Sequence, residues 1–182
     1  MKRCSWVNLS NNRYIDYHDN IWGVPCHDDY MLFEYLVLEI FQAGLTWETI
    51  INKKEYFEEA FDNFDYKKVS LYDCKKIKQL LNNKNIIRNR LKIISSINNA
   101  KVFISIINEF GSFDKYIWHF TNGKQIHYKQ FHTTSKLSDK ISNDLKMRGM
   151  KFIGSTIIYS YLEAIGVLNN HEDVCFKGGI CV

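Results

Sequence analysis

Residues 28–47 contain an apolar run that predicts the helix around which the rest of the chain is organised. Asp28 precedes the run as a helix-start residue, and Gly44 follows it where glycine commonly ends a helix. Thr46 is placed to cap a second helix, which carries Trp47. The pattern therefore predicts two helices joined by a tight turn.

Glu39 is a charged residue on the apolar side of the first helix. At helical spacing it shares a face with Leu32, Leu36 and Ala43, whereas Glu34 falls on the far side and can reach water. A buried carboxylate is costly unless it is paired, and its pKa tends to rise. A chain keeps such a group either for a structural partner, such as a lysine or arginine, or for chemistry. Taken alone, Glu39 favours the structural interpretation.

The remaining pattern predicts further helices and shows no sustained strand alternation. Two helices should fill residues 28–61, and weak helical spacing covers Asn12–His18. Further segments are a turn or helix over 65–71 and helices over 73–81, from 86 to beyond 107, over 111–120, from Ser138 or Asp139 to Gly149, and over 155–166. No linker or repeat divides the chain, so we expect one all-α domain over residues 1–182, in one or two lobes.

A basic helical hairpin is predicted in the middle of the chain. Two helices with apolar sides flank the polar turn 82–85, which makes this segment a helix-hairpin-helix candidate. Arg88, Arg90 and Lys92 come at the start of its second helix, where free amides and the helix dipole favour a phosphate. An ordinary helical hairpin with a solvated basic face is the common alternative.

The charge balance permits a nucleic-acid partner without requiring one. The formal net charge is +4, and part of it lies in the glycine-punctuated loop 146–154, where Arg148 and Lys151 could reach a backbone phosphate. Aromatic residues make up 15% of the chain, which suits either a stacking pocket or a plain core.

Cysteine usage and hydropathy predict a reduced, cytoplasmic protein. Five cysteines are an odd number, which argues against a fully paired disulfide framework. The start, Met1-Lys2-Arg3, does not resemble a signal peptide, and no apolar stretch is long enough to span a membrane. We therefore expect no membrane contact, and a reduced setting favours thiolate–metal ligation over disulfides. We also expect the protein to be a monomer.

The two ends of the chain carry a metal-site pattern. His171 and Cys175 form H-x₃-C, a spacing that places both side chains on one side of a helical turn. Cys4 and His18 are the best donors for two further positions, which would give a closed Cys₂His₂ site of the structural zinc type. The alternatives are free buried thiols, a Cys175–Cys181 pair, or ligation by Cys26 and His27.

Several ordered motifs resemble those of one known family. They are Arg3-Cys4-x-Trp6-Val7, Tyr17-His18-Asp19-Asn20-x-Trp22-Gly23-Val24-Pro25, Leu38-Glu39, Gln42-Ala43-Gly44-Leu45-Thr46-Trp47, Ile86-Ile87-Arg88, Arg148-Gly149-x-Lys151-Phe152 and Asn170-His171. Together they span nearly the whole chain and resemble the DNA-3-methyladenine glycosylase I family, within the helix-hairpin-helix glycosylase superfamily. Their number and order make the match more specific than any single motif.

The resemblance implies an enzyme that excises 3-methyladenine from alkylated double-stranded DNA by hydrolysing the N-glycosidic bond. Glu39 is implied as the catalytic residue. A structural zinc ion is implied on Cys4, His18, His171 and Cys175. The implied base pocket consists of Trp6, Tyr14, Tyr17, Trp22, Gln42 and Trp47. DNA contacts are expected at Gly44, Leu45, Arg88, Arg90, Lys92, Arg148 and Lys151.

The chemistry of base excision accounts for this residue set. An enzyme that acts on a base must take it out of the stack, and aromatic walls replace the lost stacking. Electron-rich rings and a buried carboxylate favour a cationic methylated purine. The loop Ala43-Gly44-Leu45 could wedge into the gap left by the flipped nucleotide. No lysine stands placed as a Schiff-base nucleophile, so no strand-cleaving lyase step is expected.

Three positions depart from the family's pattern, and two other classes of function compete. Asn85 stands where a glycine is expected at the hairpin turn, Leu91 replaces a small residue, and Phe41 replaces a polar one. These changes bear on how tightly DNA is bound.

One competing class is a zinc-stabilised DNA-binding module without catalysis, which leaves Glu39 unexplained. The other is a zinc hydrolase that activates water on its metal, which four protein ligands argue against.

Overall fold

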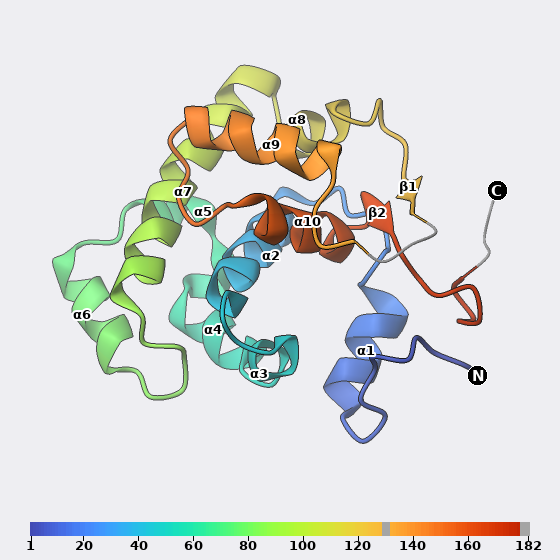
Figure 1. Cartoon of the computed structure of the whole chain (residues 1–182). Coiled ribbons are helices and arrows are strands. Elements are labelled where there is room, and N and C mark those ends of the chain that lie inside the picture. The colour runs from blue at the N-terminus through green and yellow to red at the C-terminus, as the bar shows by residue number, and fades with distance from the viewer. Residues whose placement is uncertain (129–131, 179–182) are drawn as a thin grey trace.

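The computed structural model describes residues 1–128 and 132–178, which fold mainly into helices (Figure 1). In chain order the elements are α1 (Asn12–Asn20), α2 (Asp29–Gln42), α3 (Trp47–Ile51), α4 (Lys54–Ala60), the 3₁₀ helix η1 (Asp62–Phe64), α5 (Tyr66–Ser70), α6 (Cys74–Asn82), α7 (Arg90–Phe110), α8 (Phe113–His119), β1 (Ile126–His127), α9 (Lys136–Met147), α10 (Ser155–Ala164) and β2 (Leu168–Asn169). The predicted helical character is confirmed. The parallel pairing of β1 with β2 was not predicted. None of these helices is long and apolar enough to cross a membrane.

Helix α2 lies at the centre of the fold, where α10, α7 and α3 pack against it (Figure 1). It begins where the Asp28 carboxylate accepts a hydrogen bond from the Met31 amide at 2.9 Å, as the sequence predicts. Residues 32–41 are buried almost without a break, because the helix is apolar on more than one face. Phe41 packs against Phe57 with ring centroids 4.8 Å apart, so its departure from the family's pattern fills the core.

Side-chain caps explain two helix boundaries that differ from the predicted ones. Ser135 and Ser138 form a capping box, so α9 begins before the predicted Ser138 or Asp139. The Asn89 side chain accepts an amide hydrogen bond from the first turn of α7, which leaves residues 86–87 in the connection before that helix. Asn85 in this connection does not have a positive φ, so the left-handed conformation suited to glycine is not used there.

The helix predicted after the Gly44 turn consists of two short helices. Thr46 caps α3 by accepting a hydrogen bond from the Thr49 amide at 3.3 Å, as predicted. The chain leaves helical geometry at residue 53 and starts again as α4. Two contacts join α4 to the central helix: Lys54 pairs with Glu34, and the ring of Phe57 packs against that of Phe41.

The N-terminal segment and the segment after β2 lie side by side (Figure 1). The Phe176 amide donates a hydrogen bond to the Lys2 carbonyl at 2.9 Å, and the Ser5 amide donates to a Glu172 carboxylate oxygen at 2.9 Å. Residues far apart in sequence are therefore brought together at one side of the molecule.

Gly166 allows a close approach between the end of α10 and the chain that follows α1. A Cβ atom at this position would lie 2.2 Å from the main chain of Val24, and its φ is +70°, so only glycine fits without rearrangement. In the same contact the Gly23 amide donates to the Glu163 carbonyl at 2.9 Å. This packing places Trp22, which precedes Gly23, in the wall of the cavity between α1, α2 and α10.

Candidate active site and metal centre

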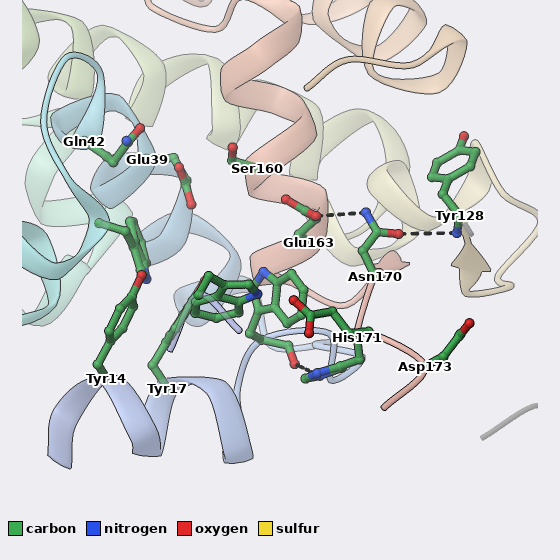
Figure 2. Close-up of a pocket in the computed structure, with 14 residues that line it drawn as sticks. Tyr14, Tyr17, Glu39, Gln42, Tyr128, Ser160, Glu163, Asn170, His171 and Asp173 are labelled. Atoms are coloured by element: carbon green, nitrogen blue, oxygen red, sulfur yellow. Dashed lines mark hydrogen bonds between the residues drawn. The ribbon is translucent and has the colours of Figure 1, made fainter. Parts of the chain in front are cut away.

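A cavity of about 600 Å³ lies between α1, α2, the start of α3, α10 and the C-terminal segment. Figure 2 shows side chains from these elements converging on it. The lining residues are Trp6, Tyr14, Tyr17, Trp22, Glu39, Gln42, Trp47, Tyr128, Ser160, Glu163, Asn170, His171, Glu172 and Asp173. The structure therefore brings all six residues predicted for the base pocket together with Glu39.

Aromatic rings form one wall of the cavity. The ring centroids of Tyr17 and Trp47 are 5.1 Å apart, and Trp6 lies 4.9 Å from Trp22 and 5.5 Å from Tyr14. The indole Nε1 of Trp47 is buried without a hydrogen-bond partner among the described residues. The rings offer flat stacking surfaces, and an unpaired buried donor remains open to an acceptor on a ligand.

Glu39 projects into this cavity from α2 and is only 3% exposed, as predicted. Burial holds the pKa of Glu39 well above its usual range, and the nearby Glu163 carboxylate raises it further. No lysine or arginine is among the lining residues that the structure describes, so the ion-pair interpretation of Glu39 finds no partner there. The prediction that Glu34 reaches water freely is corrected by the structure. The Glu34 side chain pairs with Lys54 on α4 and is only 14% exposed.

The turn after α2 is held by its own hydrogen bonds and by Lys92. The Gln42 side-chain amide donates to the Leu45 carbonyl at 2.7 Å. The Lys92 ammonium group donates to the carbonyls of Phe41 and Ala43 at 2.9 and 2.6 Å. A cation at this position satisfies carbonyls that a helix end leaves free and complements the negative end of the helix dipole. Leu45 stays exposed on the turn.

Two of the basic residues predicted to contact DNA, Lys92 and Arg148, already bind other groups of the protein. Lys92 is 6% exposed and caps α2, which corrects its predicted phosphate contact. The Arg148 guanidinium pairs with Asp144 and Glu109 at 2.7 and 2.6 Å, so its charge is already partly neutralised. The other charged residues predicted to contact DNA are exposed and form no ion pair within the described chain; they are Arg88, Arg90 and Lys151.

Lys92→Met is expected to lower the free energy of unfolding by about 1–3 kcal/mol, because two carbonyls lose their donor. Urea unfolding measures this change. Lys101→Met provides a matched control, since Lys101 is exposed on the same helix, and it should change stability by less than about 0.5 kcal/mol. Equal stability of the two variants would contradict the capping role of Lys92.

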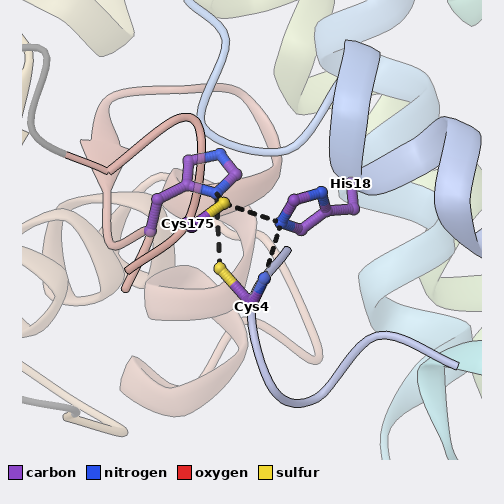
Figure 3. Close-up of side chains that lie close together, drawn as sticks. Cys4, His18 and Cys175 are labelled. Carbon is purple, nitrogen blue, oxygen red and sulfur yellow. Dashed lines mark hydrogen bonds between the residues drawn. The ribbon is translucent and has the colours of Figure 1, made fainter. Parts of the chain in front are cut away.

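Four side chains from the two ends of the chain form a cluster of metal-ligand type (Figure 3). Ligand atoms of Cys4, His18, His171 and Cys175 lie within 4.8 Å of one another. His171 Nδ1 lies 3.4 Å from the Cys4 sulfur and 3.5 Å from the Cys175 sulfur, which is 3.5 Å from His18 Nε2. The segment 171–175 is an irregular turn, not the helical turn assumed from its spacing. The cluster can hold a metal ion.

Hydrogen bonds orient both imidazole rings toward the cluster. His18 Nδ1 donates to Asp19 at 2.8 Å, and its Nε2 faces the cluster, where it accepts a hydrogen bond from the Cys4 amide at 3.4 Å. His171 Nε2 donates to the Trp22 carbonyl at 3.1 Å, so its Nδ1 faces the two sulfur atoms. Arg3 bonds to Asp19 at 2.6 Å and lowers the pKa of that carboxyl to about 2. Burial lowers the pKa of His171 to about 4, which keeps its ring neutral and able to bind a metal.

The alternative ligands from the sequence analysis lie elsewhere. The Cys26 thiol contacts the Asp28 carbonyl at 3.9 Å, and His27 pairs with Asp114 at 2.7 Å. Cys181 lies outside the described residues, so its pairing with Cys175 is not tested.

Sequence analysis missed the cavity residues that α10 and the C-terminal segment contribute. Glu163 carried the same kind of signal as Glu39, since it is the only charged residue in the apolar stretch 155–166. Its carboxylate accepts a hydrogen bond from Asn170 Nδ2 at 2.8 Å, and burial raises its pKa to about 7. Ser160, Tyr128 and Asp173 carried no comparable signal, because their positions depend on how the chain returns to the cavity.

Comparison with known proteins agrees with this architecture over the whole chain. The family model for methyladenine glycosylase matches residues 6–178. The chain is 38% identical to DNA-3-methyladenine glycosylase 1 of Escherichia coli strain K12 over 96% of both chains. It is 36% identical to DNA-3-methyladenine glycosylase of Haemophilus influenzae over 95% of this chain and 96% of the relative.

Solved structures give the same result. A crystal structure of 3-methyladenine DNA glycosylase I matches with a TM-score of 0.92 at 37% identity and covers 97% of this chain and 100% of that one. The Staphylococcus aureus enzyme matches with a TM-score of 0.90 at 36% identity, covering 96% and 95% of the two chains. These matches, together with the fold, identify the chain as a DNA glycosylase, a hydrolase of the N-glycosidic bond. Within that class the chain belongs to the methyladenine glycosylase family.

Proposed function

We propose that this chain excises 3-methyladenine from alkylated double-stranded DNA by hydrolysing the N-glycosidic bond of a base flipped into the cavity. The observation that carries the proposal is the Glu39 carboxylate, which is buried beside aromatic rings and has no hydrogen-bond or ion-pair partner among residues 1–128 and 132–178. Two similar structures, both named as 3-methyladenine DNA glycosylase I, are described in complex with 3-methyladenine or by its recognition. We also propose that the protein acts as a monomer in the cytoplasm, as the sequence predicts.

Positive charge distinguishes 3-methyladenine, while still attached to the sugar, from the normal bases. The faces of Tyr17 and Trp47 attract a cation, and its entry favours ionisation of Glu39. The ionised carboxylate then accepts a hydrogen bond from the exocyclic amine and stabilises the oxocarbenium-like transition state. The charged base is already a good leaving group, so little general-acid help is needed.

Hydrolysis by water accounts for the residues around the cavity better than a lyase reaction does. A lyase step needs an amine nucleophile that attacks the sugar. The lining residues in the described part of the chain include no lysine. We therefore propose a monofunctional glycosylase that leaves an intact backbone at the abasic site.

The DNA is proposed to lie across the α2–α3 turn and the α6–α7 hairpin. Leu45 is exposed on the turn beside Gln42 and Trp47, so it can fill the gap left by a flipped nucleotide. Gly44 has a φ of +83° and open space around it, which permits close approach of the backbone to DNA. We assign α6 and α7 to a helix-hairpin-helix motif that contacts the phosphates.

Neutralising Arg88, Arg90 and Lys151 together should weaken binding to all DNA sequences alike. Each true phosphate contact lowers the slope of log affinity against log salt by roughly one unit, so a decrease of up to about three units is expected. Fluorescence anisotropy over a salt series measures the slope. Lys124→Ala, a change at an exposed lysine near β1, is the control and should leave the slope unchanged. An unaltered slope in the triple variant would place the DNA elsewhere.

We also propose that the Cys₂His₂ cluster binds one structural zinc ion. Zinc in tetrahedral geometry, with its usual bond lengths, separates sulfur and nitrogen ligands by about 3.5 Å. The distances of 3.4 and 3.5 Å in the cluster agree with this value. Four protein ligands leave no open position, so water activation on the metal is not part of the proposal. A bound ion would tie the two ends of the chain together.

The decisive experiment incubates the protein with methylated duplex DNA and identifies the released base by mass spectrometry. We expect free 3-methyladenine and DNA that stays unnicked until alkali is added. Binding without any release would favour the zinc-stabilised DNA-binding module. Nicks formed by the protein alone would contradict the monofunctional mechanism.

A further inference from the structure

Glu163 is a half-buried carboxylate in the cavity wall that the mechanism above does not use. It lies about one turn after Ser160 on α10, so both side chains face the cavity. Figure 2 shows Glu163 and Glu39 entering the same cavity from different helices, α10 and α2. The two carboxyl groups can therefore contact one bound base from different sides.

Asn170 holds the Glu163 carboxylate in place. Its side-chain amide donates to Glu163 Oε1 at 2.8 Å and to the Tyr159 hydroxyl at 2.8 Å, while its oxygen accepts from the Tyr128 amide at 3.3 Å. Such a fully used amide fixes the orientation of the carboxylate. The second oxygen, Oε2, has no hydrogen bond within the chain as described, so it remains available to a ligand.

The described residues that line the cavity around Glu163 include acidic and phenolic groups and one imidazole, but no lysine or arginine. The titratable groups around it are Glu39 on α2, Tyr17 on α1, Tyr159 on α10, and Tyr128, His171, Glu172 and Asp173 in the cavity wall. Ionisation of both carboxyl groups in one cavity is unfavourable, because the two negative charges repel each other, until a cation enters. When one is ionised and the other protonated, the pair offers one charged acceptor and one O–H donor.

We propose that Glu163 is a second base-reading residue, which acts with Glu39 to select a cationic purine that carries an exocyclic amine. This inference rests on the proposed function, because the ligand is the same 3-methyladenine. The ionised carboxylate accepts a hydrogen bond from the amine, and the protonated partner donates to a ring nitrogen. Adenine lacks the positive charge, and guanine has a carbonyl at C6, where adenine has its amine, so the pair of carboxyl groups disfavours both bases.

The test uses Glu163→Gln, which keeps the shape and an acceptor for Asn170 but loses the charge. Binding of free 3-methyladenine is followed by quenching of the cavity tryptophans at a mildly acidic pH, at which the free base is protonated and carries the positive charge that the proposal requires. Excision is followed by single-turnover kinetics on methylated duplex DNA. Both should fall roughly tenfold to a hundredfold, with a smaller change for adenine. Glu59→Gln removes one exposed surface charge on α4 and is the matched control. Glu163→Asp keeps a carboxyl group and should retain more affinity than Glu163→Gln.

Thermal unfolding separates this role from a structural one. Burial raises the pKa of Glu163 from its ordinary 4.5 to about 7. The contribution of protonated Glu163 to the free energy of unfolding is therefore complete below a pH equal to the ordinary pKa, and it is lost as the pH rises through about 7. Glu163→Gln does not titrate, so at pH 8 it should unfold at a higher temperature than the wild type while binding the base more weakly.

Two results would overturn the inference. One is wild-type affinity and excision in Glu163→Gln, and the other is weaker binding by Glu163→Asp than by Glu163→Gln. Wild-type protein that releases no 3-methyladenine would contradict the proposed function instead. The free-base affinities would still decide the role of Glu163 in that case.

Discussion

Glu39→Gln is expected to lower the single-turnover rate of 3-methyladenine excision by about a hundredfold while the protein stays folded. Glutamine keeps the shape and one acceptor, but it loses the negative charge that the cationic base and the oxocarbenium-like transition state require. Removal of one preorganised electrostatic group from an active site typically costs about 10²–10³ in rate. Rapid-quench kinetics on methylated duplex DNA measures the effect, with circular dichroism and metal content as checks on folding.

The stability of the same variant distinguishes a functional carboxylate from a structural one. Burial holds the pKa of Glu39 well above its usual range, so stability is lost as pH rises toward that raised pKa. Glu39→Gln should therefore be at least as stable as the wild type at alkaline pH. Glu34→Gln is the matched control on the same helix: it breaks the pair with Lys54, and should lose stability but retain excision. Wild-type excision rates in a folded Glu39→Gln would return Glu39 to a structural role.

The metal cluster shows what spacing and residue type can predict. His171 and Cys175 were linked by their spacing, and Cys4 and His18 were the best remaining donors, so the four residues could be grouped before the structure was known. The buried position of Glu39 followed from helical periodicity in the same way. Both predictions succeeded because they depend on residue chemistry and local spacing.

Lys92 shows what the sequence could not provide. Its position near a helix start suggested a phosphate contact, but the ammonium group reaches the carbonyls of Phe41 and Ala43 on another helix. Main-chain acceptors carry no residue-specific signal, so a lysine that caps a distant helix looks like a solvated one. Glu163 carried a local signal, as the only charged residue of an apolar stretch, but its position in the same cavity as Glu39 follows only from the packing of α10 beside α2.

The cavity and the metal cluster are parts of one arrangement. The ring of Trp6 lies 5.4 Å from that of His18, and the ring of Trp22 lies 4.6 Å from that of His171. Two walls of the cavity therefore rest directly on two side chains of the cluster. A group that orders the cluster also orders the aromatic surface on which a base can stack.

Loss of the metal ion, or of one ligand in Cys175→Ser, is expected to lower the free energy of unfolding by at least about 3 kcal/mol. The proposed ion joins Cys4 and His18 to the far end of the chain, so it closes nearly the whole chain as one loop. The remaining ties between the ends, such as the Ser5–Glu172 hydrogen bonds, are exposed and contribute less.

Metal analysis of freshly purified protein that has not met a chelator should find about one zinc ion per chain, the number that four ligands hold. Thermal unfolding with and without a chelator then measures the stabilisation, and Cys74→Ser, at an exposed thiol outside the cluster, is the control. Tryptophan fluorescence should change on chelation, because Trp6 and Trp22 lose the side chains against which they pack. Protein without bound metal, or Cys175→Ser as stable as Cys74→Ser, would show that the four residues are ordinary buried thiols and imidazoles. The cavity walls would then depend on packing alone, and chelation should leave excision unchanged.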